Sequence, residues 1–455
     1  MKNIDKASVS KANNPRVAAI SVLSEWKRGR KYINISLDAA LRRFKGKDDD
    51  RALFAALVYG VVERGITLDA QIEHLTGRSV ESLDTATLTA LELGLYQLYY
   101  LDRVPPYAAV NETVAVAPHQ SKTLVNAVLR RAVREGKPIF ATGSAGDIGS
   151  VRELSLLHSL PEWIIEEWMR DYPDDYPSLC ASVNSRPPVT LRVNTLRTDV
   201  PTLLARLCDD KSGALAAVQN PICPDMIDIT NAGNITELFG YDSGLWFVQD
   251  AASRICAAAA GAVSGDVVID VCSAPGGKSF SLAIDMKNEG VVYAFDLHEK
   301  RARLVQEGAL RLGLSIIKAA AHDARMPDEA LIRRADVVLC DVPCSGLGVI
   351  AKKPDIRYKD KADVMSLPDV QSAILSSSAE YVKPGGVLVY STCTLRRAEN
   401  EDVVDTFLEN HGGFEPCGFS VANISAPRGQ ITLMPHKNGS DGFFIAKFKR
   451  KSDIK

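Results

Sequence analysis

The chain has 455 residues, of which 46% are hydrophobic and 24% charged, and its formal net charge is −2. Because an average domain has about 100–200 residues, this length predicts two or three domains, each able to bury a core. Apolar stretches such as 255–263 are far shorter than the roughly 20 residues that cross a bilayer. Residues 1–14 also lack the apolar core of a secretory signal. We therefore expect a cytoplasmic protein with no membrane segment.

The nine cysteines include no CxxC pair and no Cys/His cluster at zinc spacing. This pattern predicts no metal site, and a reducing compartment would leave the thiols unpaired. Most of them are expected to be small core residues.

Positive charge is concentrated at the front of the chain. Residues 1–150 hold 21 Lys and Arg against 16 Asp and Glu, whereas the remainder holds 33 against 40. Basic runs at 27–31, 42–47 and 130–137 are typical of surfaces that face phosphate. Solvated helix faces are the alternative, and charge alone leaves both interpretations open.

Residues 14 to about 137 have apolar residues at helical spacing throughout, which predicts a compact helical domain. The expected helices are 16–26, 35–44, 50–64, 66–75, 85–101, 108–117 and 123–134. Gly136, Pro138 and the Gly143–Gly146 segment then predict a linker. A helix at 154–172, a strand at 189–194 and a short helix from Val200 indicate a small mixed α/β module.

From Gly244 onward, strand patterns alternate with helix patterns, which predicts a doubly wound, mostly parallel sheet. The strands are expected at 267–271, 291–295, 315–319, 337–340 and 387–390, and the helices at 278–286, 299–312, 362–382 and 399–409. Such sheets bind ligands at the carboxyl ends of their strands, where the winding reverses. The expected domains are therefore 1–145, 146–243 and 244–455.

A glycine-rich turn, Asp270-Val271-Cys272-Ser273-Ala274-Pro275-Gly276-Gly277-Lys278, follows the first of these strands and opens a helix. It is neither GxGxxG nor a Walker sequence, and its helix N-terminus favours a negative group such as a carboxylate. Asp296 ends the second strand, where an acid binds ribose hydroxyls in folds of this kind. Asp323 follows the third and is a candidate for an adenine amino group. A plain turn and helix N-caps are the alternatives.

Two cysteines follow the fourth and fifth strands, in Asp341-Val342-Pro343-Cys344 and Ser391-Thr392-Cys393-Thr394. Carbon 5 of a pyrimidine becomes nucleophilic only after a thiolate adds to carbon 6. Cysteine suits that step because its thiolate is accessible near neutral pH and strongly nucleophilic. Buried cysteines at strand ends often only pack, but two of them beside Asp341 favour the chemistry.

These motifs together resemble the Sun/Nop family of S-adenosylmethionine-dependent RNA cytosine carbon-5 methyltransferases, in the bacterial ribosomal type with a NusB-like front domain. The segments that carry the resemblance are 188–195, 247–253, the glycine-rich turn, 341–349, 353–357, 383–386, 390–394 and 441–444, with 104–112 and 125–131 in front. The resemblance implies an all-α NusB-like domain, a small α/β RNA-binding module and a Rossmann-like methyltransferase domain.

By resemblance, Cys393 attacks carbon 6 and Cys344 assists breakdown of the covalent adduct. Asp341 would hold the cytosine edge and share a proton with its ring nitrogen, and Lys278 would orient the base or the acid. The residues implied to bind S-adenosylmethionine are Cys272, Ser273, Ala274, Pro275, Gly276, Gly277, Lys278, Asp296, Asp323 and Asp341. In this chain His322-Asp323-Ala324-Arg325 stands where Gly-Asp-Gly-Arg is frequent in the family.

The expected substrate is 16S ribosomal RNA, and the expected state is a monomer with no protein partner. Lys352, Lys353, Arg357 and Lys359 are candidates for steering flanking phosphates, or for an exposed loop. The same chemistry on transfer RNA is the nearest rival. A non-catalytic RNA-binding assembly factor and a small-molecule methyltransferase are the others.

Overall fold

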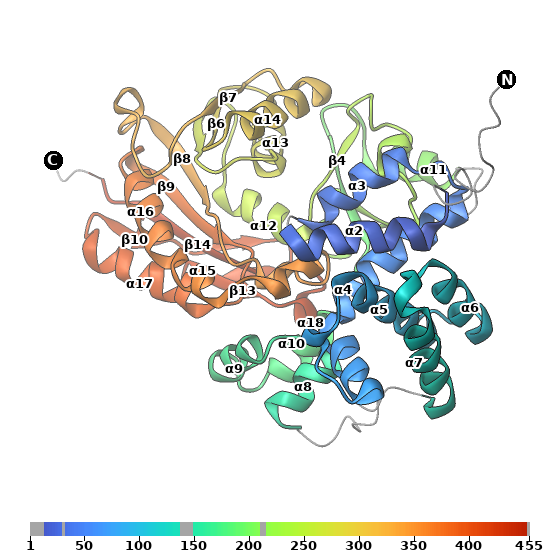
Figure 1. The fold of residues 1–455 in the computed structure, drawn as a ribbon. Coiled ribbons are helices and arrows are strands. Elements are labelled where there is room, and N and C mark those ends of the chain that lie inside the picture. Colours follow the sequence, from blue (N-terminus) through green and yellow to red (C-terminus); the bar gives the residue numbers. More distant parts are fainter. Residues whose placement is uncertain (1–12, 30–31, 137–148, 210–214, 453–455) are drawn as a thin grey trace. The chain divides into compact units, whose positions relative to one another are not determined.

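The computed structural model describes residues 13–29, 32–136, 149–209 and 215–452, which form two compact units (Figure 1). One unit extends to Ser185 and includes Ile350–Tyr358, and the other holds Arg186–Val349 and the chain from Lys359. Arg30, Lys31 and the predicted linker after Gly136 lie outside the described residues. Across the described part of the chain, no helix is long and apolar enough to cross a membrane.

The first unit is helical. Its helices are α2 (Pro15–Gly29), α3 (Ile33–Arg43), α4 (Asp48–Thr76), α5 (Thr85–Tyr100), α6 (Pro106–Val116), α7 (Lys122–Glu135), α8 (Val151–His158), α9 (Glu162–Asp171) and α10 (Tyr176–Ser182). Asp84 caps α5 by accepting from the backbone N–H groups of Ala86 and Thr87, and Gly77 ends α4 in the left-handed conformation. Leu57, Leu91 and Leu129 are fully buried in the core that α4, α5 and α7 share.

The prediction of two helices at 50–64 and 66–75 is wrong, because α4 continues through Gly65. A Cβ at Gly65 would lie 2.2 Å from the hydroxyl of Tyr358. That hydroxyl donates to the carbonyl of Val62 at 2.9 Å, and the ring packs edge-on against Trp26 at 5.2 Å. Gly65 therefore admits Tyr358 to the helix surface and does not break the helix.

The predicted helix at 154–172 is also wrong as a single element. The structure has α8 and α9, separated at Ser159, which is left-handed with φ of 55°. Pro161 precedes α9, and a proline inside a continuous helix would remove a backbone donor and clash with the preceding turn.

The second unit contains an eight-stranded sheet in the order β10-β14-β9-β8-β5-β6-β7, with β13 paired to β14. Its strands are β5 (Val267–Asp270), β6 (Val291–Asp296), β7 (Ile317–Ala321), β8 (Ala335–Asp341), β9 (Val382–Thr392), β10 (Phe414–Pro416), β13 (Gln430–Leu433) and β14 (Phe443–Arg450). The strands from β5 to β9 are parallel, and the winding reverses between β5 and β8. The antiparallel strand β14, which sequence reasoning did not assign, pairs with β9.

Helices cover both faces of this sheet (Figure 1). α12 (Ala251–Ala260), α13 (Gly277–Asp285) and α14 (Glu299–Leu312) pack on one face, and α16 (Leu367–Ala379) and α17 (Glu401–Asn410) pack on the other. The single helix predicted at 362–382 is wrong. The structure has α15 (Lys361–Met365) and then α16, and Val382 already begins β9. The unit also contains β11 (Phe419–Val421), β12 (Ile424–Ala426) and α18 (Pro435–Asn438).

A smaller antiparallel sheet has the order β2-β3-β1-β4. Its elements are β1 (Val189–Val193), α11 (Val200–Cys208), β2 (Ala216–Gln219), β3 (Met226–Thr230) and β4 (Trp246–Val248). Leu191, Ile227 and Trp246 are fully buried in its core. The three predicted fold classes are confirmed. They are an all-α front domain, a small α/β module and an α/β domain with a mostly parallel core. The two compact units divide the chain differently from the ranges 1–145, 146–243 and 244–455, which stay a prediction.

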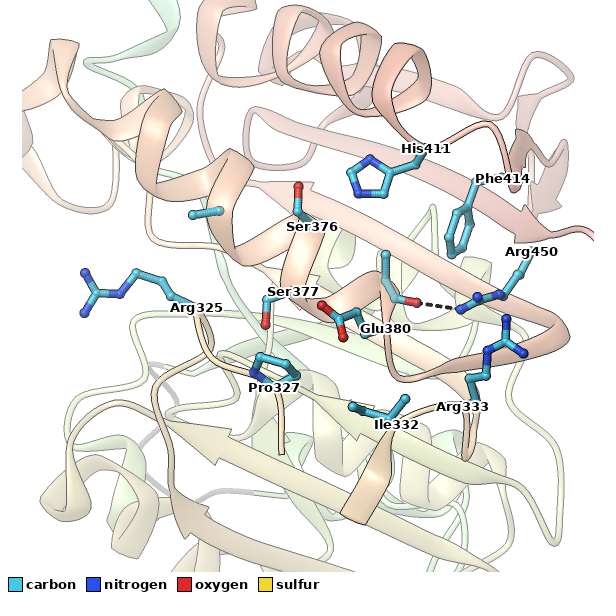
Figure 2. Close-up of a pocket in the computed structure, with 12 residues that line it drawn as sticks. Arg325, Pro327, Ile332, Arg333, Ser376, Ser377, Glu380, His411, Phe414 and Arg450 are labelled. Carbon is cyan, nitrogen blue, oxygen red and sulfur yellow. Dashed lines mark hydrogen bonds between the residues drawn. The ribbon is translucent and has the colours of Figure 1, made fainter. Parts of the chain in front are cut away.

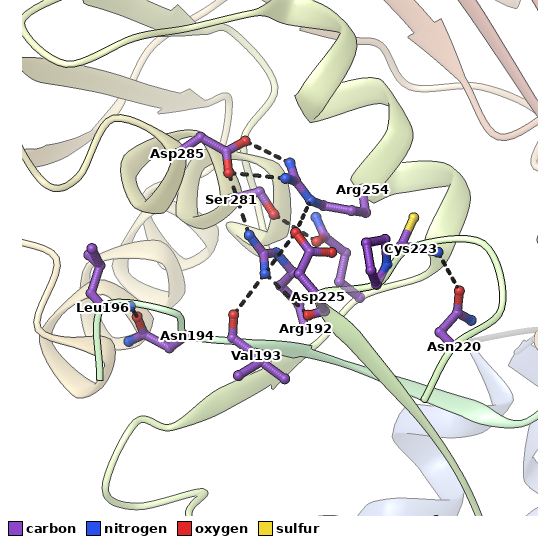
Figure 3. Close-up of polar contacts among 12 residues, drawn as sticks. Arg192, Val193, Asn194, Leu196, Asn220, Cys223, Asp225, Arg254, Ser281 and Asp285 are labelled. Atoms are coloured by element: carbon purple, nitrogen blue, oxygen red, sulfur yellow. Dashed lines mark hydrogen bonds and ion pairs between the residues drawn. The ribbon is translucent and has the colours of Figure 1, made fainter. Parts of the chain in front are cut away.

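A ring of four charges joins the small sheet to the large domain (Figure 3). Arg192 on β1 pairs with Asp225 at 3.0 Å and with Asp285 of α13 at 3.5 Å. Arg254 of α12 pairs with the same two carboxylates, at 3.0 and 2.6 Å. The side chain of Arg192 is only 2% exposed, so its charge depends on these partners. The ring therefore fixes β1 against α12 and α13.

Two carboxyl groups meet in the interior of the first unit. Asp69 of α4 lies beside Glu92 of α5, whose carboxylate accepts from Lys27 of α2 at 2.5 Å. Burial, followed by the charge of Glu92, raises the pKa of Asp69 to about 8. Folding therefore binds a proton that the unfolded chain, with an Asp pKa of about 4, releases at neutral pH.

We expect the stability of the first unit to fall as pH rises from about 4 to about 8, because the folded Asp69 holds its proton over that window. Asp69→Asn should flatten this dependence and raise stability near pH 8 by at least about 1.4 kcal/mol, the value of one pKa unit. Urea unfolding followed by circular dichroism at several pH values would measure it. Asp102→Asn, at an exposed position, is the matched control, and an unchanged pH profile in Asp69→Asn would contradict the assignment.

Candidate active site

The parallel pairing of β8 with β9 brings the two predicted cysteines together. Asp341, the last residue of β8, lies opposite Ser391 of β9. Cys344 and Cys393 follow these two positions, and their Sγ atoms are 3.3 Å apart. Both side chains are partly exposed. The structure therefore joins two residues that are 49 positions apart in sequence into one thiol pair.

The thiol pair lies at the same sheet edge as a partly buried ion pair. Nζ of Lys278, which is in the first turn of α13, donates to Oδ2 of Asp341 at 2.7 Å, and Oγ of Ser391 donates to Oδ1 at 2.9 Å. The Lys278 ammonium also lies 4.9 Å from the ring centroid of Phe443. Burial alone would lower the pKa of Lys278, but the Asp341 carboxylate raises it above its ordinary value. Asp341 thus faces a fixed positive charge.

Cys344 is held as a thiol. The hydrogen bond with Cys393 raises the pKa of Cys344 well above its usual value, and burial raises it further. Cys344 therefore favours its protonated form, and the sulfur of Cys393 lies 3.3 Å from it.

The glycine-rich turn connects β5 to α13 at this edge. Gly276 has φ of 110°, and a Cβ there would lie 2.3 Å from the ring of Phe280. Nε2 of Gln249 donates to the carbonyl of Gly277 at 2.9 Å, and Oε1 of Gln249 accepts from Ser281 at 2.7 Å. The motif at 247–253 therefore supports the turn through Gln249.

The turn fits a ligand with a negative group and hydroxyls. Helix α13 begins without a side-chain cap, so its first N–H groups are available to an anion. Oγ of Ser273 is buried and has no hydrogen-bond partner among the described residues. Asp296 ends β6, where its carboxylate accepts from the N–H of His298 at 3.1 Å and pairs with Arg301 at 3.3 Å.

Asp323 follows the end of β7, whereas Asp296 is the last residue of β6. Arg325 binds both oxygens of the Asp323 carboxylate, and the shortest distance is 2.6 Å. The hydrogen bonds from Arg325 lower the pKa of Asp323 to about 2.

Cys272 belongs to the glycine-rich turn itself. Burial raises the pKa of its thiol well above the usual value.

Asp270 is a buried carboxyl group next to the site, and the predicted site residues do not include it. Its carboxyl group lies beneath the turn, where Oδ2 accepts from Oγ of Ser279 at 2.6 Å and Oδ1 has no partner among the described residues. Burial raises the pKa of Asp270 to about 7. Its position as the last residue of the strand before the glycine-rich turn is the signal that could have identified it.

The phosphate-steering prediction for Arg357 is wrong. Arg357 is fully buried, with its guanidinium donating to the carbonyls of Glu63, Ser159 and Pro354 in the first unit. Nζ of Lys359 donates to the carbonyl of Ser345 at 2.8 Å and braces the turn after Cys344. Lys353 is exposed and stays a candidate.

An open groove of about 580 Å³ is lined by residues from several elements of the second unit (Figure 2). Arg333 precedes β8 and Glu380 precedes β9, so these residues lie at the edge of the sheet opposite the thiols. Arg325 is paired with Asp323, and Arg450 donates to the carbonyls of Ala379 and Val382. Cys344, Cys393 and Lys278 do not line the groove.

A doubly wound sheet with a glycine-rich turn after β5 and an acid ending β6 defines a Rossmann-like domain. The family described as "16S rRNA methyltransferase RsmB/F" matches residues 259–449, the "NusB family" matches 13–134, and "Methyltr_RsmF/B-like, ferredoxin-like domain" matches 160–236. The chain belongs to the RsmB/F (Sun) family.

A relative from Bacillus subtilis, named "Probable ribosomal RNA small subunit methyltransferase B", is 34% identical over 97% of this chain and 100% of its own length. Among solved structures, PH0851 is similar with a TM-score of 0.79 and 24% identity, over 96% of this chain and 99% of its own. NSun6 from Pyrococcus horikoshii, solved with SFG, has a TM-score of 0.57 and 23% identity, over 64% of this chain and 99% of its own. These two structural likenesses show the fold.

We expect Gly276→Ala to destabilise the second unit by about 1–3 kcal/mol, because a Cβ there is strained at positive φ and collides with Phe280. Gly412→Ala is the matched control, since a Cβ at Gly412 has no atom within 4 Å. Guanidinium unfolding of both variants would measure the difference. Equal free energies of unfolding for Gly276→Ala and Gly412→Ala would show that the turn accommodates the Cβ without strain.

Proposed function

We propose that this protein transfers a methyl group from S-adenosylmethionine to carbon 5 of a cytosine in 16S ribosomal RNA, through a covalent bond between Cys393 and carbon 6. The observation that carries the proposal is the thiol pair at 3.3 Å beside the Asp341–Lys278 ion pair. Membership of the RsmB/F family supports rRNA methylation, and the site residues support the choice of carbon 5.

Addition of the Cys393 thiolate to carbon 6 pushes an electron pair into the ring. The ring nitrogen accepts this negative charge as it gains a proton. Asp341 is proposed to hold that nitrogen and to share with it a proton that the carboxylate takes up from solvent. Lys278 keeps the Asp341 carboxyl in place, because its Nζ and Oγ of Ser391 bind the two oxygens of that group. Carbon 5 then becomes nucleophilic.

Cys344 is proposed to act after addition. Once the sulfur of Cys393 is bonded to carbon 6, the hydrogen bond that contributes most to the raised pKa of Cys344 is lost. Cys344 can then release its proton to solvent and take the proton of carbon 5. The electrons of that C–H bond reform the ring double bond, and the bond from carbon 6 to sulfur breaks.

S-adenosylmethionine supplies the methyl group when bound. The turn from Cys272 to Lys278 and the N-terminus of α13 would hold its amino-acid end, and Asp296 would hold the ribose hydroxyls. Asp323 is proposed for the adenine amino group, and Asp341 lies at the inner end of the same site. NSun6, a neighbour of the same fold, was solved with SFG, an analogue of S-adenosylmethionine, which supports the choice of cofactor.

The target base must leave any duplex before a thiol can reach its carbon 6. The NusB-like domain is proposed to bind the RNA backbone through its exposed basic residues. These are Arg28, Arg42, Arg43, Lys45, Lys47, Arg130 and Arg134. Phosphate contacts of this kind position RNA without reading its sequence.

We expect Cys393→Ala to abolish methyl transfer and form no adduct, since it removes the nucleophile. Cys344→Ala should slow turnover by about 10²–10⁴-fold and accumulate a protein–RNA adduct, because release of the carbon 5 proton is impaired. Labelled methyl transfer and denaturing gels would measure both. Cys417→Ala, a partly exposed cysteine of the same unit, is the control. If Cys393→Ala still formed an adduct, Cys344 would be the nucleophile and Cys393 the thiol that assists breakdown of the adduct.

Unmodified small-subunit RNA should be methylated, and bulk transfer RNA should not. Labelled S-adenosylmethionine with each RNA in parallel would measure the choice, and nuclease mapping would locate the methyl on carbon 5. Labelling of transfer RNA alone would keep the chemistry and overturn the target. No labelling of either RNA by a protein that binds RNA would favour a non-catalytic assembly factor.

A further inference from the structure

A buried carboxylate that the proposed mechanism does not use lies behind the thiol pair. Glu399 is fully buried and belongs to the short 3-10 helix η7 (Arg397–Glu399), in the chain segment that follows Cys393. Its Oε1 accepts from Nη1 of Arg396 at 3.0 Å. This ion pair allows the charge to persist in the interior.

The other oxygen of Glu399 holds the turn that carries Cys344. Oε2 accepts from the backbone N–H of Ser345 and from Nε2 of Gln371, both at 2.8 Å. The same Nε2 donates to the carbonyl of Pro343 at 3.0 Å. Glu399 and Gln371 together therefore fix the residues on both sides of Cys344.

The segment that carries Cys393 is tied to the same group. Tyr390 of β9 donates its hydroxyl to the carbonyl of Glu399 at 2.6 Å. Oγ of Ser345 and Oγ1 of Thr394 are 2.6 Å apart, which links the residues that follow the two cysteines. The positions of the two sulfurs thus depend on one buried network.

We propose that Glu399 and Gln371 form a positioning pair that sets the separation of Cys344 and Cys393 and places a negative charge behind Cys344. The pair touches neither substrate nor cofactor in this scheme, so its effect on catalysis acts through the thiols. This inference rests on the proposed function, since a thiol separation matters to catalysis only if both thiols react. Its geometric part is measurable without RNA.

The charge of Glu399 has its own expected effect on Cys344. The hydrogen bond with Cys393 and burial raise the pKa of Cys344, and the negative charges of Cys393 and Glu399 add to that rise. The charged or titratable groups that face Cys344 are Cys393, Glu399, Tyr390 and the Lys359 ammonium bound to its carbonyl. Removing the Glu399 charge should therefore shift the titration of Cys344 to lower pH.

The first test measures how fast Cys344 and Cys393 form a disulfide in the full-length protein. Diamide accepts the two hydrogens as the S–S bond forms, and peptide mass spectrometry identifies the pair. Gln371→Met removes the hydrogen bonds of the Gln371 amide and leaves the Glu399 charge in place. This variant and Glu399→Gln should each slow disulfide formation about tenfold, because an intramolecular reaction depends steeply on alignment. Glu307→Gln, an exposed carboxylate on α14, should leave it at the wild-type rate.

The second test separates charge from geometry. The pH profile of Cys344 alkylation by iodoacetamide should move by about one pH unit toward lower pH in Glu399→Gln and stay in place in Gln371→Met. A purely structural role would move neither profile.

Folded variants that form the disulfide at the wild-type rate, or an unmoved alkylation profile in Glu399→Gln, would overturn the proposal. If Glu399→Gln fails to fold by near-ultraviolet circular dichroism, the disulfide rate of Gln371→Met decides. If the wild-type protein methylates no RNA while both thiol experiments give the expected results, the proposed function fails and the positioning pair stands.

Discussion

The hydrogen-bonded register between β8 and β9 is the constraint on which the site depends. It sets Asp341 opposite Ser391, and the chain then needs only a few residues after each strand to bring Cys344 within 3.3 Å of Cys393. Side chains alternate along a strand, so a slip of one residue would turn either end to the other face of the sheet. The hydrogen bond between the hydroxyls of Ser345 and Thr394 holds the two segments that follow these strands in the same register.

The glycine-rich turn belongs to the same edge because β5 lies next to β8 in the sheet. Helix α13 begins there and carries Lys278 to Asp341, so the turn and the thiol pair are linked by one ion pair at 2.7 Å. At the other end of α13, Asp285 joins the charge ring with Arg192 and Arg254. Helix α13 therefore connects the sheet edge that carries the thiols with the ion pairs that hold the small sheet.

Three buried cations of the second unit have carboxylate partners, as desolvation requires. Lys278 faces Asp341, Arg396 faces Glu399, and Arg192 faces two carboxylates. The ion pair of Glu399 and Arg396 stands out because it is almost entirely buried and lies behind the reactive sulfurs. Such a pair contributes little net stability but strongly restricts geometry, which is what two thiols in a single site need.

The sequence by itself determined the class of fold, the glycine-rich turn and the identity of the two thiols, because these depend on local periodicity and on short motifs. Only the tertiary structure decided that α4 runs through Gly65, that β14 pairs with β9, and that Arg357 is buried and not a phosphate ligand. It also revealed Asp270 and Glu399. Each of these depends on contacts between residues far apart in the chain, which local patterns do not encode.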